Sequence, residues 1–231
     1  MLEELLPPAL GTICVSLLAV ATALPFSVIT GIFISEYLSG RIQNILILFF
    51  KILSAVPSVI VGLCGFILIL SLNTIFGTHF RTSLFLSALS LAILITPYIV
   101  IAVILGFREI PKERRLCAVS LGAEKYQNIF YVLLPESLPF IFSGIILAVA
   151  RAVEDTAVIM LTGAAAFSGF PTALDSSFEA LPFFIYYHSA EYSTKDELIQ
   201  IGTAAVILII ISVGLVYLSD SVKNKIGTEK R

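Results

Sequence analysis

Apolar residues gather along this chain in five long runs that are separated by shorter polar segments. The runs cover residues 10–35, 45–72, 84–107, 138–162 and 201–219. A helix needs about 20 predominantly apolar residues to cross a bilayer, and each run is about that long or longer. Within the runs the period is helical or the residues are apolar on every side, unlike the alternation of a membrane β-strand. The pattern therefore predicts an all-α, polytopic membrane helix bundle with about five transmembrane helices.

Composition indicates the same class of protein. Of the 231 residues, 58% are hydrophobic and 13% are charged, whereas a soluble domain has about 45–50% apolar and about 25% charged residues. The net charge of -2 excludes a strongly basic surface for nucleic acid. Pro25, Pro57 and Pro97 lie inside the first three runs, where neighbouring membrane helices can satisfy the freed backbone groups. We expect a multi-pass protein of the cell membrane.

Lys and Arg residues are distributed unevenly among the polar segments, and cytoplasmic loops carry an excess of these residues. If residues 107–135 are cytoplasmic, only Arg81 and Lys195 lie outside, and Arg151 lies within the fourth run. The basic residues that then lie inside are Arg41, Lys51, Arg108, Lys112, Arg114, Arg115, Lys125, Lys223, Lys225, Lys230 and Arg231. This asymmetry predicts a cytoplasmic C-terminus and an external loop at 163–200, with a short helix near 179–187.

The predicted cytoplasmic loop has a distinctive spacing of small and apolar residues. From Arg108 onward it reads REIPKERRLCAVSLGAEKYQNIFYVLLPESLP. Ala118 and Gly122 are separated by three residues, and a Leu-Pro pair ending at Pro135 follows. We expect a helix at 112–121, a turn at Gly122, and a second helix at 125–133 that Pro135 ends. An ordinary charged loop between two spans is the simpler alternative.

This loop resembles the EAA loop of ABC importer permeases, whose coupling helix docks on an ATPase subunit. Leu116, Cys117 and Ala118 stand where the family has Glu-Ala-Ala, so the acidic residue of the pattern is missing here. The resemblance implies that the ATPase-coupling residues are Leu116, Cys117, Ala118, Gly122 and Ala123.

Three further stretches are similar to motifs of phosphate permeases. They are SAVPSVIVGLCG at 54–65, ARAVEDTA at 150–157 and EALPFFIYY at 179–187. The chain thus resembles the permease subunit of a phosphate ABC importer. That resemblance implies a type I importer permease fold and one transmembrane domain over 1–231, with a cytoplasmic coupling loop at 107–135. It also implies partner ATPase subunits that bind ATP, a second permease subunit, identical or homologous, and an external phosphate-binding protein.

The fourth run contains the ionisable residues Arg151, Glu154 and Asp155, followed by Thr156. Charges within a membrane are costly and usually face a bundle interior or a wet path. At spacings of three and four residues, both acids can reach the guanidinium on one helix face, and guanidinium is a natural partner of phosphate. These residues are therefore candidates for the substrate path. A purely structural ion pair is the alternative.

Small residues recur around Pro57 in the second run, at Ser54, Ser58 and Gly62. Small residues allow close approach of membrane helices, which makes helix packing one interpretation. The other is that Ser54 and Ser58 contribute hydroxyl groups to the substrate path.

The sequence shows no recognisable catalytic motif. It lacks the G-x-x-x-x-G-K-[ST] loop that binds nucleotide phosphates, and His79 and His188 have no acidic residues at metal-ligand spacing. We expect no enzyme activity, no metal site and no cofactor in this chain. Three other functions remain open. They are a permease for another oxyanion such as sulfate, molybdate or tungstate, a secondary transporter or channel without an ATPase, and a membrane scaffold that transports nothing.

Overall fold

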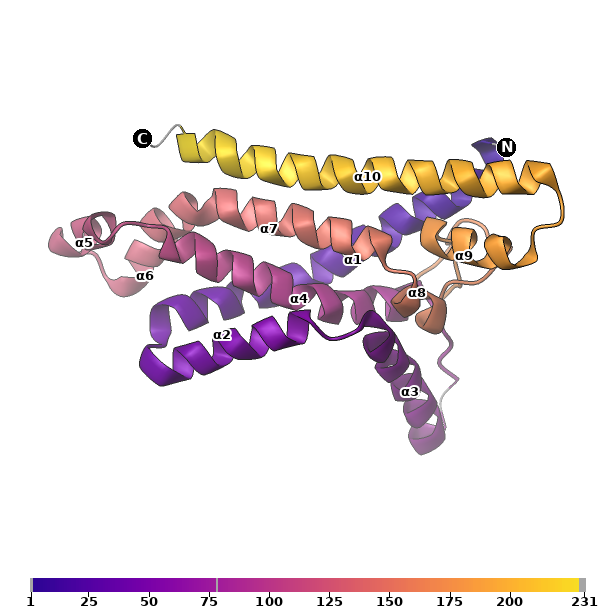
Figure 1. Cartoon of the computed structure of the whole chain (residues 1–231). Coiled ribbons are helices and arrows are strands. Elements are labelled where there is room, and N and C mark those ends of the chain that lie inside the picture. The colour runs from indigo at the N-terminus through magenta and orange to yellow at the C-terminus, as the bar shows by residue number, and fades with distance from the viewer. Residues whose placement is uncertain (1, 78, 229–231) are drawn as a thin grey trace. The chain divides into compact units, whose positions relative to one another are not determined.

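The computed structural model describes residues 2–77 and 79–228, with side chains at 4–77 and 79–222, and this part of the chain is almost entirely helical (Figure 1). Its elements are α1 (Leu2–Ile32), the π-turn η1 (Phe33–Tyr37), α2 (Gly40–Ser54), α3 (Ser58–Phe76), α4 (Leu84–Arg108), α5 (Lys112–Ser120), α6 (Lys125–Asn128), the π-turn η2 (Ile129–Leu133), α7 (Leu134–Glu154), α8 (Ala157–Thr162), α9 (Leu181–Glu191) and α10 (Lys195–Thr228). The only β-structure in the described residues is one bridge between Ala164 and Phe178. The expected all-α class is confirmed.

Five helical segments among the described residues are long and apolar enough to cross a membrane. They are Glu4–Tyr37, Ser58–Phe76, Leu84–Arg108, Lys125–Glu154 and Lys195–Val222. Each overlaps one of the five expected runs, and α1 and α4 continue through Pro25 and Pro97. The expected number of spans therefore agrees with the structure, although the second and fourth spans differ clearly from their expected bounds.

The second run is not one helix. Residues up to Ser54 belong to α2, residues from Ser58 onward belong to α3, and only α3 qualifies as a candidate span. Pro57 causes the break, because it has no N–H to donate to a helix and disfavours helical angles at the residue before it. The expected span at 45–72 was therefore wrong in its first half.

The helix of the fourth span begins and ends earlier than expected. It starts at Lys125 and continues past Pro135 to Glu154, so the expectation that Pro135 ends a helix was wrong. The π-turn η2 directly precedes α7, and such a turn resets the backbone hydrogen-bond pattern near the residue that cannot donate. At the other end, Asp155 and Thr156 are not helical, and the expected continuation to residue 162 forms the separate helix α8.

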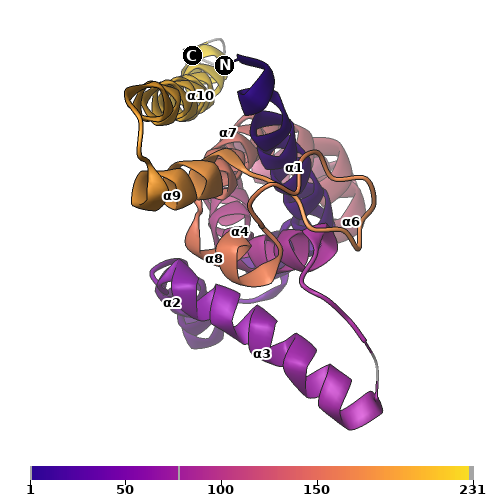
Figure 2. The same cartoon turned by 90° about the vertical axis from the view of Figure 1, so that its right-hand side faces the viewer.

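Two compact units make up the chain. The first comprises Met1–Ala23, Val56–Ile95 and Val149–Leu215. In it α3 and α8 lie side by side (Figure 2), because Gly62 has no side chain: a Cβ there would lie 2.9 Å from the Cα of Val158. Helix α9 confirms the short helix expected near 179–187, and its Leu181 N–H donates to the Thr12 hydroxyl at 2.8 Å.

The second unit comprises Leu24–Ala55, Thr96–Ala148 and Val216–Arg231. Its core contains Ile34, Ile47, Val100 and Ile104, all of them buried. Polar contacts supplement this core, since the Gln43 amide donates to the carbonyl oxygens of residues 34 and 35 at 2.9 and 3.3 Å. These hydrogen bonds satisfy two carbonyl groups of η1 and hold η1 beside α2.

Candidate functional site

The loop that the sequence singled out forms a helical hairpin within the second unit. Helix α5 ends one residue earlier than expected, at Ser120, and Gly122 adopts a φ of 87°. The N–H of Ala123 donates to the Ala118 carbonyl and the N–H of Gly122 donates to the Val119 carbonyl, both at 3.0 Å. This pair of bonds is the Schellman motif, in which a left-handed glycine ends a helix. The four-residue offset from Ala118 to Gly122 is the spacing that this motif requires.

The second arm of the hairpin begins with a capping box. The N–H of Glu124 donates to the side-chain oxygen of Gln127 at 2.9 Å, and such a box satisfies backbone donors at a helix start. Within the expected second helix, residues 125–128 form α6 and residues 129–133 form η2. The expected helix–turn–helix is therefore present.

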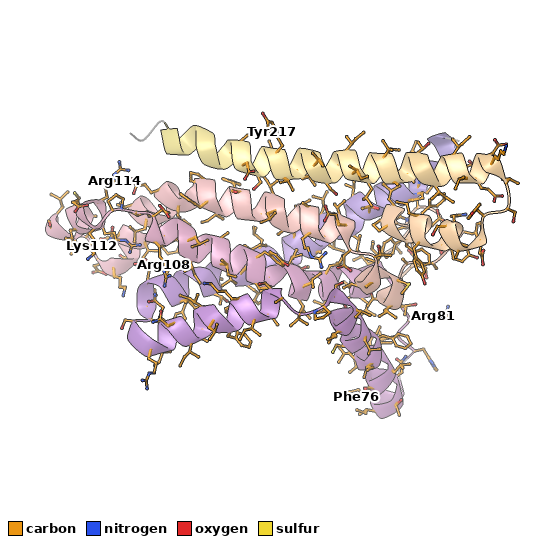
Figure 3. The ribbon with its side chains drawn as sticks, in the orientation of Figure 1. Phe76, Arg81, Arg108, Lys112, Arg114 and Tyr217 are labelled. Atoms are coloured by element: carbon orange, nitrogen blue, oxygen red, sulfur yellow. The ribbon has the colours of Figure 1, made fainter. Side chains whose placement is uncertain are left out.

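The hairpin exposes apolar side chains at its turn. Leu116 is 60% exposed and Leu121 is 90% exposed. Cys117 is exposed as well, whereas Ala118 and Ala123 are half-buried. The basic residues Lys112 and Arg114 lie in α5 itself, and Arg108 ends α4 shortly before it (Figure 3). Clustered apolar side chains on an exposed surface are typical of a protein interaction site.

Contacts that the sequence analysis did not anticipate anchor this hairpin. Arg115 donates to Glu36 Oε1 at 2.8 Å and also to the carbonyl oxygen of Phe107. The Nζ of Lys125 lies 4.5 Å from the ring centroid of Tyr37. Glu36 precedes Arg115 by 79 residues, so no local pattern joins the two residues.

The ionisable residues of the fourth run lie at the carboxyl end of α7, in the first unit. Arg151 Nη2 lies 3.3 Å from Asp155 Oδ2, and the Asp155 side chain is only 1% exposed. The other carboxylate oxygen of Asp155 accepts the N–H of Val158 at 2.8 Å, at the start of α8. Asp155 thus joins Arg151 to the next helix.

The two acids of this cluster differ in their surroundings. Asp155 is buried against Arg151, whereas Glu154 is exposed. Thr156 is half-buried, and its carbonyl oxygen accepts the N–H of Met160 at 3.0 Å. The sequence suggested that both acids reach the guanidinium, but among the described residues the ion pair of Arg151 is with Asp155.

The two candidate serines lie in different units, Ser54 in the second and Ser58 in the first. The Ser54 hydroxyl donates to the Lys51 carbonyl at 2.8 Å, and the Ser54 carbonyl accepts the hydroxyl of Tyr98 at 3.1 Å. Ser58 is half-buried at the first position of α3. The Ser54 hydroxyl is thus already bonded within its own helix, whereas Ser58 begins the helix that packs on α8.

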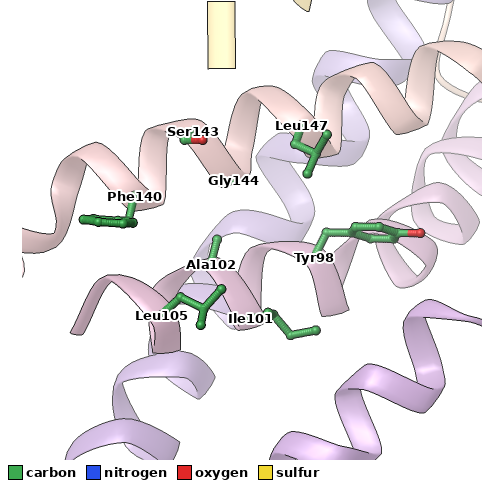
Figure 4. A pocket seen from close by; sticks show the side chains of 8 residues that line it. All are labelled: Tyr98, Ile101, Ala102, Leu105, Phe140, Ser143, Gly144 and Leu147. Carbon is green, nitrogen blue, oxygen red and sulfur yellow. The ribbon is translucent and has the colours of Figure 1, made fainter. Parts of the chain in front are cut away.

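A shallow pocket lies between α4 and α7 in the second unit (Figure 4). Its lining residues are Tyr98, Ile101, Ala102, Leu105, Phe140, Ser143, Gly144 and Leu147. The hydroxyl of Ser143 is 2.8 Å from that of Ser219, and Tyr98 donates as described. No lining residue is charged, so this pocket does not suit an anion. The part of the chain that the structure describes also holds no group of three or more His, Cys, Asp or Glu residues that fits a metal ion.

Curated relatives of this chain are membrane permeases. It is 28% identical over 223 residues to the phosphate transport system permease protein PstA 1 of Mycobacterium tuberculosis, covering 96% of this chain and 70% of that protein. It is 27% identical over 206 residues to a probable PstA permease of Methanocaldococcus jannaschii, covering 88% of this chain and 70% of that protein.

Solved structures show the same fold. A chain of the MetNI methionine ABC transporter, in an inward-facing conformation, superposes with a TM-score of 0.69 at 16% identity, covering 94% of this chain and 93% of that chain. A chain of an amino acid ABC transporter gives a TM-score of 0.62 at 17% identity, covering 94% and 92%. These matches confirm the expected fold of a type I importer permease.

Residues 23–223 match the family described as binding-protein-dependent transport system inner membrane component. The match includes the hairpin, the Arg151–Asp155 pair and the second part of the first span, from residue 23 onward. This chain belongs to the family of binding-protein-dependent transport system inner membrane components.

Proposed function

We propose that this chain is the transmembrane permease subunit of an ATP-driven importer of inorganic phosphate. The observation that carries the proposal is its similarity, over most of its length, to permeases named for phosphate transport. Membership of a binding-protein-dependent transport family favours an ABC importer over a secondary carrier or a channel. The phosphate relatives likewise favour phosphate over sulfate, molybdate or tungstate.

The α5–α6 hairpin is the docking site for the ATPase subunit in this proposal. Its glycine turn presents the exposed Leu116 and Leu121 to a partner, and the buried core of a protein interface is its most apolar part. The residues assigned to coupling are Leu116, Cys117, Ala118, Gly122 and Ala123. ATP binds on the partner, so hydrolysis is carried out there and not in this chain. The hairpin and the C-terminus lie in the cytoplasm.

The substrate path passes Arg151 in the first unit. Its side chain is one-third exposed, so the guanidinium has donors that Asp155 does not occupy. Glu154 is exposed at the end of α7 and is a further candidate residue of the path. Thr156 and Ser58 offer hydroxyl groups from the neighbouring segments. Arg151 is therefore the phosphate-binding residue, while Asp155 holds its orientation.

The complete importer requires a second permease subunit, two ATPase subunits and an external protein that delivers phosphate. One chain with five spans provides one wall of a pathway, and the second permease provides the other. Closure of the ATPase dimer moves the hairpins, and the spans change between outward-open and inward-open arrangements. Such rigid-body motion is a common form of alternating access.

Purification from membranes followed by transport measurements tests this proposal. The tagged chain, extracted in mild detergent, is expected to retain an ATPase subunit that carries a G-x-x-x-x-G-K-[ST] loop. Proteoliposomes that contain the complex and the binding protein should accumulate radiolabelled phosphate only with ATP, and unlabelled sulfate or molybdate should not compete. Uptake without any ATPase would indicate a secondary transporter, and competition by sulfate would indicate a broader oxyanion importer.

A further inference from the structure

The hairpin is attached to the body of the second unit through two adjacent residues of one π-turn. Glu36 binds Arg115 of α5 at 2.8 Å, and the ring of Tyr37 lies beneath Lys125 of α6 at 4.5 Å. Both residues belong to η1, which continues directly from α1. One turn of the chain therefore contacts both arms of the hairpin.

The Glu36–Arg115 pair is shielded from solvent, with 10% of the Glu36 side chain and 27% of the Arg115 side chain exposed. Arg115 also donates to the carbonyl oxygen of Phe107 in the last turn of α4. Guanidinium is planar and carries several donors, so it can bind two acceptors in a defined geometry, which the single ammonium of lysine does poorly. Arg115 thus connects α5 with η1 and with the end of α4.

The two arms of the hairpin are also joined to each other. The Asn128 amide of α6 donates to the Arg115 carbonyl at 3.1 Å, and Asn128 is buried. A displacement of α5 therefore moves α6 with it. The turn that receives this displacement is itself held, because the Gln43 amide binds its backbone carbonyls.

We propose that Glu36 and Tyr37 are positioning residues that transmit the movement of the docked hairpin to the first span. This inference rests on the proposed function, because it assumes that the hairpin binds the ATPase. The ATPase contacts the exposed turn around Leu121 in this proposal, whereas Glu36 and Tyr37 contact other residues of the hairpin, Arg115 and Lys125. Weakening their contacts should therefore uncouple ATP hydrolysis from transport and leave the docking surface intact.

The test compares Glu36→Gln with a matched control in the reconstituted complex with ATPase and binding protein. Glutamine keeps an oxygen for the Arg115 guanidinium and removes the charge. Glu109→Gln removes the charge of an exposed acid that lies between α4 and α5. We expect both variants to retain the ATPase and its hydrolysis rate, whereas only Glu36→Gln lowers phosphate taken up per ATP, by about fivefold or more.

A second pair of variants examines the aromatic contact. Tyr37→Phe keeps the ring that attracts the Lys125 ammonium, whereas Tyr37→Leu removes it. Lower uptake per ATP in Tyr37→Leu, with normal coupling in Tyr37→Phe, would support transmission through this contact.

The outcomes distinguish a failure of the transmission role from a failure of the proposed function. If wild-type protein binds the ATPase and Glu36→Gln transports as well per ATP as wild type, the transmission role is wrong and the docking proposal stands. If Glu36→Gln loses the ATPase, Glu36 only shapes the hairpin, and the transmission role is again wrong. If wild-type protein binds no ATPase, the proposed function itself fails and the transmission role fails with it.

Discussion

Arg151 and Asp155 are the residues whose chemistry has the most direct bearing on phosphate. Asp155 performs two tasks, since one oxygen faces Arg151 and the other accepts the Val158 N–H. Asparagine at this position keeps an oxygen acceptor for the backbone and loses the charge. Variants at these two positions can therefore distinguish a substrate-binding arginine from a structural one.

We expect Arg151→Met to insert and assemble but to lose phosphate uptake. The single change leaves the Asp155 carboxylate buried without its cation, which costs about 3–5 kcal/mol of stability. The double variant Arg151→Met with Asp155→Asn should recover most of that stability and remain inactive in uptake. Thermal unfolding and vesicle uptake are the two measurements. Near-normal uptake by the assembled double variant would remove Arg151 from the substrate path.

Gly122 is the second residue whose replacement has a definite physical consequence. Its φ of 87° lies in the left-handed region, and a Cβ added there meets nothing within 4 Å. Any cost of substitution therefore comes from the backbone angles, at roughly 1–2 kcal/mol for a residue with a Cβ. Gly122→Val should lower ATPase co-purification while the amount of chain in the membrane stays the same.

Two controls accompany this prediction. Gly122→Asn should retain more ATPase than Gly122→Val, because asparagine tolerates left-handed angles. Gly77→Val imposes similar backbone strain at a φ of 62°, again with nothing within 4 Å of the added Cβ, but in the loop after α3. It should leave ATPase binding unchanged. Full ATPase retention by Gly122→Val would contradict the docking assignment.

At the scale of the elements, the contact between α3 and α8 depends on a missing side chain. A Cβ at Gly62 would lie 2.9 Å from Val158 Cα and 3.1 Å from the Ala157 carbonyl oxygen. Neither of these backbone atoms can rotate away, so the two helices must separate. The packing interpretation of the small residues around Pro57 has direct support at Gly62.

Gly62→Ala should lower the stability of the chain by about 1–3 kcal/mol, as expected for overpacking. Gly202→Ala is the matched comparison, because a Cβ at that position of α10 meets nothing within 4 Å. Replacing a helical glycine by alanine at an open site should stabilise by about 0.5–1 kcal/mol. Thermal unfolding in detergent measures both effects, and equal shifts of Tm in the two variants would contradict the packing argument.

At the scale of the whole molecule, the orientation in the membrane stays a prediction from the basic residues. In a background without native cysteines, a cysteine at Glu113 should react with a thiol reagent confined to the cytoplasm. A cysteine at Thr172, an exposed residue of the predicted external loop, should react with an impermeant external reagent. Ser176 lies in the same predicted external loop but is half-buried, so it is a poorer labelling position than Thr172. Near the C-terminus, Glu229, Lys230 and Arg231 lie outside the described residues. Reaction of each cysteine with the reagent on the opposite side would show that the predicted orientation is wrong.

Much of the architecture was predictable from the order of residues. Length and apolarity predicted the number of spans, because the bilayer sets a minimum length for an apolar helix. The turn of the hairpin was predictable because it depends only on nearby residues. Its Schellman motif, which includes the carbonyl of Ala118 and the left-handed backbone of Gly122, lies within six consecutive residues. Proline was a less reliable guide, since Pro57 breaks a helix, whereas Pro97 and Pro135 do not. Whether a helix continues past a proline depends on π-turns and neighbouring groups, which the local sequence does not reveal.

The sequence by itself therefore determined the class of fold, the number of spans and the hairpin, since these follow from interactions between residues close together in the chain. Tertiary structure decided which charges are paired. Glu154 and Asp155 are neighbours in sequence, but the break after α7 buries one against Arg151 and leaves the other exposed. Glu36 and Arg115 are 79 residues apart in the chain and form an ion pair within the second unit. Such contacts depend on where whole helices lie. Helix positions are set by packing between residues far apart in the chain, and short sequence patterns do not reveal that packing.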